Sequence, residues 1–311
     1  MESLRFLIAA SALGAMAVWG SEVLFWTAPT DALSAPDLAL TWLAYSIAAA
    51  AALAMVITTG CGGLRGAFLG GAILGYLAEG VMVGTIYDAF PFQLVWTPLA
   101  WHALITGVGV FALGRAAVHW RLRVQVAAMV CLGALGGVWG WFWPVERADL
   151  PGFGATFAYL VGLGLFVPVA QMVLDRLGAV PHPPRWVLAA PWAIAALVWV
   201  LSSLADPRPT RLALPLVLGL TVWIMARLGA GMPTFGAPPA HPLRHAVMLL
   251  APLVAAPVAV IGWKMFGAVE VNIPFALLTC ALALGWWLRL LWLAYRAPNA
   301  VSAAPRSSAP S

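Results

Sequence analysis

The stretch LRFLIAASALGAMAVWGSEVLFW, residues 4–26, decides the fold class. Apart from Arg5 near its start, it carries a single charged residue, Glu22. At 1.5 Å per residue, a helix of this length crosses the hydrocarbon core of a bilayer, which is about 30 Å thick. Ala15-Met16-Ala17 resembles a signal-peptide cleavage site, but the apolar run continues to Phe25. We therefore predict an uncleaved first membrane helix.

Nine further apolar runs follow, separated by short breaks rich in Pro, Gly and charge. They cover residues 38–59, 64–86, 93–114, 124–144, 153–174, 186–204, 210–228, 245–266 and 273–294. The whole chain is 63% hydrophobic and 9% charged, whereas soluble domains are about 25% charged. Because lipid cannot satisfy exposed backbone, such runs form helices. The sequence predicts an all-α polytopic membrane bundle of about ten helices, with residues 1–296 as one transmembrane domain.

The arginines predict the orientation of this bundle. With the N-terminus inside, inner segments hold twelve of the sixteen Lys and Arg, and outer segments hold Arg147, Arg208, Arg211 and Lys264. Positive charge collects on the cytoplasmic side of membrane proteins, so both termini are expected in the cytoplasm. Residues 297–311, rich in Ala, Pro and Ser, are expected to form a disordered cytoplasmic tail. Fifteen Arg against one Lys favours a GC-rich bacterium, and hence a bacterial inner membrane.

Residues 75–102, GYLAEGVMVGTIYDAFPFQLVWTPLAWH, place polar groups inside the membrane. Glu79 is expected about 22 Å from the inner edge and His102 about 15 Å, near the midplane. Intramembrane ionisable groups are costly and are therefore functional candidates. We expect the two side chains to relay a proton or bind a cation. The alternative is a hydrogen-bonded pair that only locks two helices together.

Two further acids are candidates for binding an ion or a substrate. Glu22 and Asp88 could join Glu79 in an acidic mouth that collects cations. The alternatives are a headgroup contact for Glu22 and an ordinary loop position for Asp88. Pro98, four residues before His102, frees the carbonyl of Leu94 and predicts an irregular helix beside the site.

Small residues predict which helices lie inside the bundle. Gly71 and Gly75 in the third run, and Gly133 and Gly137 in the fifth, are four residues apart. This spacing lets helix backbones approach closely, so both helices are expected in the interior. Most of the seventeen tryptophans lie near helix ends, where an interfacial belt explains them.

Several classes of site are not indicated. The sequence has no GxxxxGK[ST], GxSxG, HExxH or GxGxxG motif. Three distant cysteines form no metal or disulfide pattern. His241 and His245 are four apart, but Pro242 intervenes and no third ligand is near, so no metal site is predicted. No cofactor is indicated, and the scattered arginines do not predict nucleic-acid binding.

These observations favour a small secondary transporter that carries a small molecule or an ion across the bilayer. The segment Ala17-Val18-Trp19-Gly20-Ser21, with ten helices in about 300 residues, resembles the drug/metabolite transporter superfamily over this one stretch and in topology. Five plus five helices permit an inverted repeat, although residues 1–150 and 151–300 show no matching sequence.

Two alternatives remain open at the level of sequence. The first is a membrane-embedded enzyme acting on a lipid or isoprenoid, with Glu79, Asp88 and His102 as acid, base or metal ligands. The sparse acids and histidines argue against it. The second is a non-catalytic subunit or assembly factor of a membrane complex. The lipid bilayer is the one partner expected in every case, and the sequence leaves homo-oligomers and complex partners open.

Overall fold

The computed structural model describes residues 1–29, 33–178, 183–229 and 239–297, and no strand occurs among them. Within these ranges ten helices are long and apolar enough to cross a membrane. In chain order, spans 1 to 10 are Glu2–Trp26, Ala35–Thr59, Gly63–Val83, Gln93–Ala117, Leu122–Glu146, Phe153–Leu177, Arg185–Ala205, Pro209–Leu228, Pro242–Phe266 and Asn272–Arg296. The predicted all-α bundle is confirmed. The first and last residues of every predicted run lie within three residues of the first and last residues of the corresponding span. The predicted tail from residue 298 lies outside the described residues.

Most spans join more than one helical element. Span 1 consists of α1 (Glu2–Ala17), η1 (Val18–Val23) and α2 (Leu24–Trp26); span 2 is α3 (Ala35–Thr59); span 3 is α4 (Gly63–Leu77) and η2 (Ala78–Val83), followed by η3 (Thr85–Tyr87). Span 4 is α5 (Gln93–Val95), η4 (Trp96–Gly114) and α6 (Arg115–Ala117); span 5 is α7 (Leu122–Trp139), η5 (Gly140–Phe142) and α8 (Trp143–Glu146). Span 6 is α9 (Phe153–Gly164) and α10 (Phe166–Leu177); span 7 is α11 (Arg185–Ala205); span 8 is η6 (Pro209–Leu212) and α12 (Ala213–Leu228). Span 9 is α13 (Pro242–Ala246), η7 (Val247–Leu249) and α14 (Leu250–Phe266), and span 10 is α15 (Asn272–Arg296). Three of these elements, η1, η2 and η4, are π-helical.

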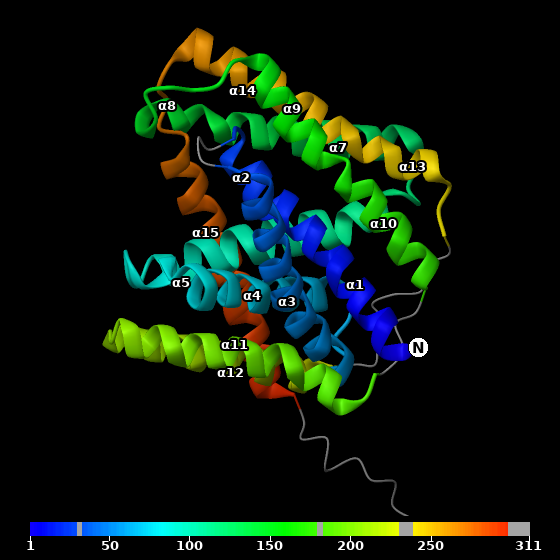
Figure 1. The fold of residues 1–311 in the computed structure, drawn as a ribbon, viewed down its shortest axis with the longest axis vertical. Coiled ribbons are helices and arrows are strands. Elements are labelled where there is room, and N and C mark those ends of the chain that lie inside the picture. Colours follow the sequence, from blue (N-terminus) through cyan, green and yellow to red (C-terminus); the bar gives the residue numbers. More distant parts are fainter. Residues whose placement is uncertain (30–32, 179–182, 230–238, 298–311) are drawn as a thin grey trace, which may run out of the picture.

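The spans alternate in direction across the molecule. Figure 1 shows the N-terminus and α13 at one end of the bundle, and α5 and α8 at the opposite end. We call the first of these the arginine-rich end, since the starts of spans 1, 3, 5, 7 and 9 together with the ends of spans 4, 6, 8 and 10 carry most of the arginines. The arginine-rich end is the end that the charge distribution predicts to be cytoplasmic.

Spans 1, 3 and 4 form the interior. About 72%, 78% and 67% of their apolar windows are buried, compared with 17% for span 7. The interior position predicted for span 3 is therefore confirmed. The same prediction for span 5 is only half right, because its burial is 44%. Gly133 and Gly137 pack against α14, whereas Val130 and Leu135 on its other faces are exposed.

Spans 3 and 4 make the closest contact in the core. A Cβ on Gly75 would lie 2.6 Å from the Cβ of His102 and 2.7 Å from the Cα of Pro98. A Cβ on Gly71 would lie 2.9 Å from the Cα of Ala103. Only glycine allows these backbones to touch, and this contact holds His102 against the end of span 3.

A sharp stop ends span 3 just beyond this contact. Gly84 has a φ of +89°, a conformation that side chains with a Cβ rarely adopt. The chain leaves η2 there and turns into η3 instead of continuing outward. Glu79 therefore lies in the last turns of span 3, and Thr85 is brought back beside it.

The packing between the two halves is symmetric in part. Exchanging spans 1–5 with spans 6–10 converts the packing of span 4 on span 10 into that of span 9 on span 5. The same exchange relates span 1 on span 4 to span 6 on span 9, and span 3 on span 7 to span 8 on span 2. The extensive pairs 1–2, 2–3 and 3–4 have no comparable counterpart among the described residues of spans 6–9, and the pair 8–10 has none in spans 3 and 5. Each half has an odd number of spans, so the shared part of this pattern is the one that an inverted repeat would produce.

Replacing Gly75 with valine tests the contact between spans 3 and 4. The new side chain would collide with His102 and Pro98, and overpacking of this kind costs about 1–3 kcal/mol. We expect Gly75→Val to lower the Tm of the purified protein in detergent by several degrees. Gly162→Val is the matched control, because a Cβ on Gly162 meets nothing within 4 Å. Equal Tm values for the two variants would contradict the contact.

Candidate functional site

The candidate residues converge from the three π-helical segments. Ser21 and Glu22 lie on η1, Glu79 on η2, and His102 on η4. π-Helices account for well under about 1% of residues in globular proteins and concentrate at functional sites. Three such segments meeting at one point therefore mark this region of the molecule.

His102 connects Ser21 to Glu79. Its Nδ1 lies 2.7 Å from the Ser21 hydroxyl, and its Nε2 lies 2.9 Å from Oε1 of Glu79. The His102 side chain is 2% exposed and that of Glu79 is 13% exposed. The ring therefore sits in the protein interior, and the carboxylate lies nearer its edge.

Further hydroxyls extend this arrangement in both directions. The Thr85 hydroxyl donates to the other oxygen of Glu79. The Ser21 hydroxyl lies 2.9 Å from the Thr106 hydroxyl. Every polar atom of this row thus has a partner inside the protein, as a buried polar network requires.

Glu22 and Tyr45 form the second part of the site. The Tyr45 hydroxyl donates to Oε1 of Glu22 over 2.5 Å, and the Trp26 indole donates to Oε2 over 3.2 Å. The hydroxyl of Tyr45 also interacts with Ser21 and lies in the field of both Glu22 and Glu79. We call Ser21, Glu22, Tyr45, Glu79 and His102 the polar cluster.

Asp88 lies apart from the polar cluster. Its side chain is 66% exposed on the loop after η3 and pairs with Arg208 over 3.2 Å. Arg208 also pairs with Asp206 over 2.8 Å. Desolvation acts to raise the pKa of the Asp206 carboxyl, but hydrogen bonds from Arg211 and Arg208 outweigh it and lower that pKa. Exposed pairs of this kind contribute little stability, and they form a surface network separate from Glu22 and Glu79.

Tryptophan side chains close the outer side of the cluster. The indole of Trp101 donates to the Gly20 carbonyl over 3.1 Å, and that of Trp139 donates to the Phe25 carbonyl over 2.7 Å. Both carbonyls belong to span 1, near its π-helical turn. Trp96, Trp101, Trp139 and Trp143 are 2–7% exposed, so the interfacial belt does not explain them. Trp101, Trp139 and Trp143 donate to backbone carbonyls of span 1, as irregular backbone inside a membrane requires.

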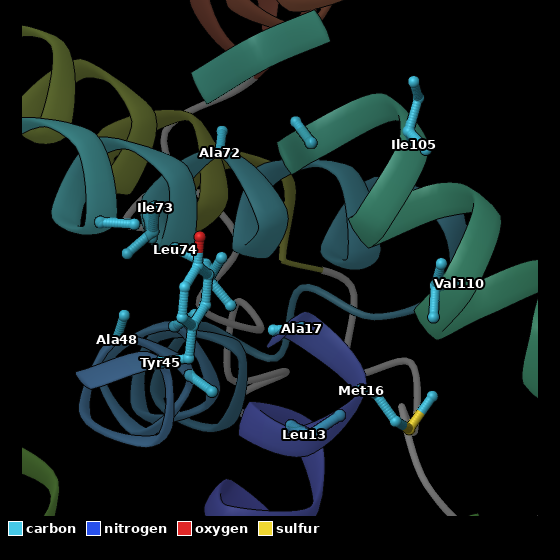
Figure 2. Close-up of a cluster of buried hydrophobic side chains, with 14 of the residues drawn as sticks. Leu13, Met16, Ala17, Tyr45, Ala48, Ala72, Ile73, Leu74, Ile105 and Val110 are labelled. Carbon is cyan, nitrogen blue, oxygen red and sulfur yellow. The ribbon is translucent and has the colours of Figure 1, made fainter. Parts of the chain in front are cut away.

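A cavity approaches the cluster from the arginine-rich end. It measures about 350 Å³ and lies between spans 1 to 4. Leu64 and His119 are exposed at its mouth, and Leu13, Ala49 and Leu74 line its buried part. Counted along the helices, this part ends about 6–12 Å before the polar cluster. Figure 2 shows Tyr45 reaching toward Leu74, with Leu13 and Ala17 beside them in the buried core.

A second buried group of polar side chains lies at the arginine-rich end. Asp175 on α10 accepts from Arg115 over 2.9 Å and pairs with His245 over 2.8 Å. The other nitrogen of His245 lies 3.1 Å from the Gln171 side-chain oxygen. The sequence analysis did not anticipate this group, which joins spans 4, 6 and 9. Among the described residues, no group of three or more His, Cys, Asp and Glu is placed to hold a metal ion.

The sequence analysis also missed Ser21 and Tyr45. Neither is ionised at neutral pH, and neither stands out in an apolar run by composition. The available signal was position, since Ser21 precedes Glu22 directly and both lie near the predicted depth of Glu79. Only the packing of spans 1, 2 and 4 brings the two hydroxyls to His102.

Comparisons with protein-family models, with curated proteins and with solved structures found no match to this chain. The class that the fold defines is a multi-pass α-helical membrane protein with a buried polar cluster between its first four spans.

Trp101→Phe tests the role of the indoles. The substitution removes the indole hydrogen bond to the Gly20 carbonyl, which is worth about 0.5–1.5 kcal/mol. The matched control is Trp19→Phe, because the Trp19 indole N–H is buried and has no hydrogen-bond partner. We expect Trp101→Phe to lower the Tm in detergent clearly more than Trp19→Phe. Equal losses would mean that ring volume alone accounts for the effect.

Proposed function

We propose that the protein is a proton-coupled secondary transporter and that the polar cluster holds the coupling proton. The observation that carries this proposal is the position of His102, buried between the Ser21 hydroxyl and the Glu79 carboxylate. Ionisable groups inside a membrane mark ion or substrate pathways. The arginine-rich composition supports a bacterial cytoplasmic membrane as the location.

The geometry of His102 suits the storage of one proton. With a neutral ring, Nε2–H donates to Glu79 and the Ser21 hydroxyl donates to Nδ1. With a protonated ring, both N–H groups donate and Ser21 turns its hydroxyl hydrogen toward Thr106. The heavy atoms keep the same contacts in both states. The cluster can therefore change its charge by one while the ring nitrogens, the Ser21 hydroxyl and the Glu79 carboxylate keep their partners.

Two carboxylates flank the buried centre and supply a path for the proton. Glu22 and Glu79 are both partly exposed, whereas Tyr45, Ser21 and His102 between them are buried. A proton can pass along this row through hydroxyl and imidazole groups. Carboxyl groups at its ends can exchange the proton with water.

The wider architecture supports alternating access to this site. Part of the contact pattern between the halves is the one expected of an inverted repeat, an arrangement that lets one half of a transporter rock against the other. The cavity from the arginine-rich end stops short of the cluster, and the tryptophans cover the cluster on the opposite side. This is the geometry expected of a state open toward the arginine-rich end.

A second candidate function rests on one observation. Ser21, His102 and Glu79 have the connectivity of a nucleophile, a base and an orienting acid. This supports a membrane-embedded hydrolase or acyltransferase that acts on a lipid. However, Ser21 is 4% exposed and is bonded to both Thr106 and His102. A nucleophile needs room for its substrate, whereas a proton relay does not, so transport is the better-supported function.

Substitution of the cluster tests the transport proposal. In proteoliposomes on a solid-supported membrane, a panel of organic acids, amines and neutral solutes is screened for currents that depend on a pH gradient. We expect Glu79→Gln and His102→Gln to reduce such currents at least about tenfold at equal protein content, the loss that removal of one essential group in a relay produces. Asp88→Asn is the matched control and is expected to keep them. Unchanged currents in Glu79→Gln would overturn the proposal.

A fluorophosphonate probe tests the enzymatic alternative directly. The probe bonds covalently to activated serine hydroxyls in native membranes. The proton-relay account predicts that the probe does not label Ser21, so that the parent protein and Ser21→Ala give the same labelling. Labelling that disappears in both Ser21→Ala and His102→Gln would favour the enzyme instead.

A further inference from the structure

The cavity at the arginine-rich end has an unusual distribution of polar groups. Its wall consists of Ala, Gly, Leu, Val and Phe side chains from spans 1 to 4, apart from two basic residues. These two are Arg115, in the last turn of span 4, and His119, in the turn that follows it at the arginine-rich end. No acid lines the cavity. An occupant therefore meets an apolar interior and a basic mouth.

Arg115 is held in place but keeps donors for a ligand. Its side chain is 17% exposed and donates to the Asp175 carboxylate over 2.9 Å and to the Gln171 carbonyl over 3.4 Å. These bonds use two of the five N–H donors of a guanidinium. Asp175 is also bound by His245 and by the backbone N–H of Ala240, and none of these three residues lines the cavity. The fixed guanidinium can still bind a carboxylate with directional, charge-assisted hydrogen bonds.

The surroundings of the mouth favour an anion further. Arg65, Arg121 and Arg123 are exposed at the starts of spans 3 and 5, at the same end of the bundle. A cleft with cationic surroundings and low-dielectric walls concentrates anions. The volume of about 350 Å³ lies within the range of small-molecule sites and holds a body of roughly the size of two fused rings.

We infer that the substrate of this cavity is an amphipathic organic monocarboxylate, with its apolar body between spans 1 to 4 and its carboxylate at Arg115 and His119. This inference rests on the proposed transport function and specifies its substrate class. Joint movement of one carboxylate with the proton held by the polar cluster is electrically neutral. The observation that places the substrate is the coincidence of an apolar wall, a basic mouth and a fixed guanidinium in one cavity.

Calorimetric titration with 2-naphthoate tests the inference on the full-length protein in phosphatidylcholine nanodiscs. The probe has a two-ring apolar body and one carboxylate. Neutral 2-naphthamide keeps the body, and acetate keeps the charge. Loss of the charge-assisted bonds or of the apolar contacts should each raise the Kd at least about tenfold. Binding of 2-naphthamide as tight as that of 2-naphthoate would overturn the inference.

A cavity-filling variant links this binding to the cavity. A Cβ on Gly70 makes one ordinary contact, 3.5 Å to Val56, so a larger side chain fits there and projects into the cavity. Gly70→Leu is expected to weaken 2-naphthoate binding at least about tenfold while the Tm stays unchanged. Gly162→Leu is the matched control and is expected to bind as the parent protein does, because a Cβ on Gly162 meets nothing within 4 Å and Gly162 does not line the cavity. Parent-like binding in Gly70→Leu would place the probe elsewhere and overturn the inference.

Two further arms separate the possible sources of failure. Titration in nanodiscs that contain phosphatidylglycerol tests whether an anionic lipid occupies the cavity. Strong competition of this lipid with 2-naphthoate would overturn the inference. The titration needs no pH gradient. If 2-naphthoate binds in the cavity but transport does not need Glu79, only the proton-coupling proposal would be contradicted. If the protein transports other solutes with protons but does not bind 2-naphthoate, only the inferred monocarboxylate substrate would be contradicted.

Discussion

The glycine contact between spans 3 and 4 is the constraint on which the rest of the site depends. Gly75 allows the backbone of span 3 to meet Pro98 and His102 without an intervening side chain. At this separation the imidazole reaches Glu79 near the end of span 3 and Ser21 on span 1 at the same time. Any larger residue at position 75 would move His102 away from one of its two partners. The contact thus converts three separate polar residues into one connected cluster.

Irregular helix geometry makes this convergence compatible with a membrane interior. The π-helical segments η1, η2 and η4 disturb the regular backbone ladder where the polar residues lie. Indole N–H groups from spans 4 and 5 bind carbonyls near these disturbances in span 1. Lipid could not provide such bonds. The buried tryptophans therefore stabilise the backbone that presents Ser21 and Glu22.

The sequence predicts the fold well because its dominant physical cause is local. Each span is a continuous apolar run, so both ends of every predicted run fall within three residues of the observed span. The arginines between alternate runs independently support the number of spans. Glu79 and His102 could be singled out for the same reason, since a charge within an apolar run is visible by itself. Ser21 and Tyr45 could not, because a hydroxyl becomes significant only through its neighbours in space. The Asp175–His245–Arg115 group likewise depends on the packing of spans 4, 6 and 9, which no periodicity encodes.

The central claim is that His102 is shared between Ser21 and Glu79 in a place that water does not reach. Solid-state ¹⁵N NMR of the histidine-labelled protein in lipid tests it most directly, with the His102 signals assigned by their loss in a His102 variant. The structure predicts that Ser21→Ala shifts the Nδ1 resonance, that Glu79→Gln shifts Nε2, and that Asp88→Asn shifts neither. Polarisation transfer from water should reach exposed His119 and not His102. The account would be contradicted if the His102 resonances were unchanged in both Ser21→Ala and Glu79→Gln and if polarisation transfer from water reached His102 as strongly as His119.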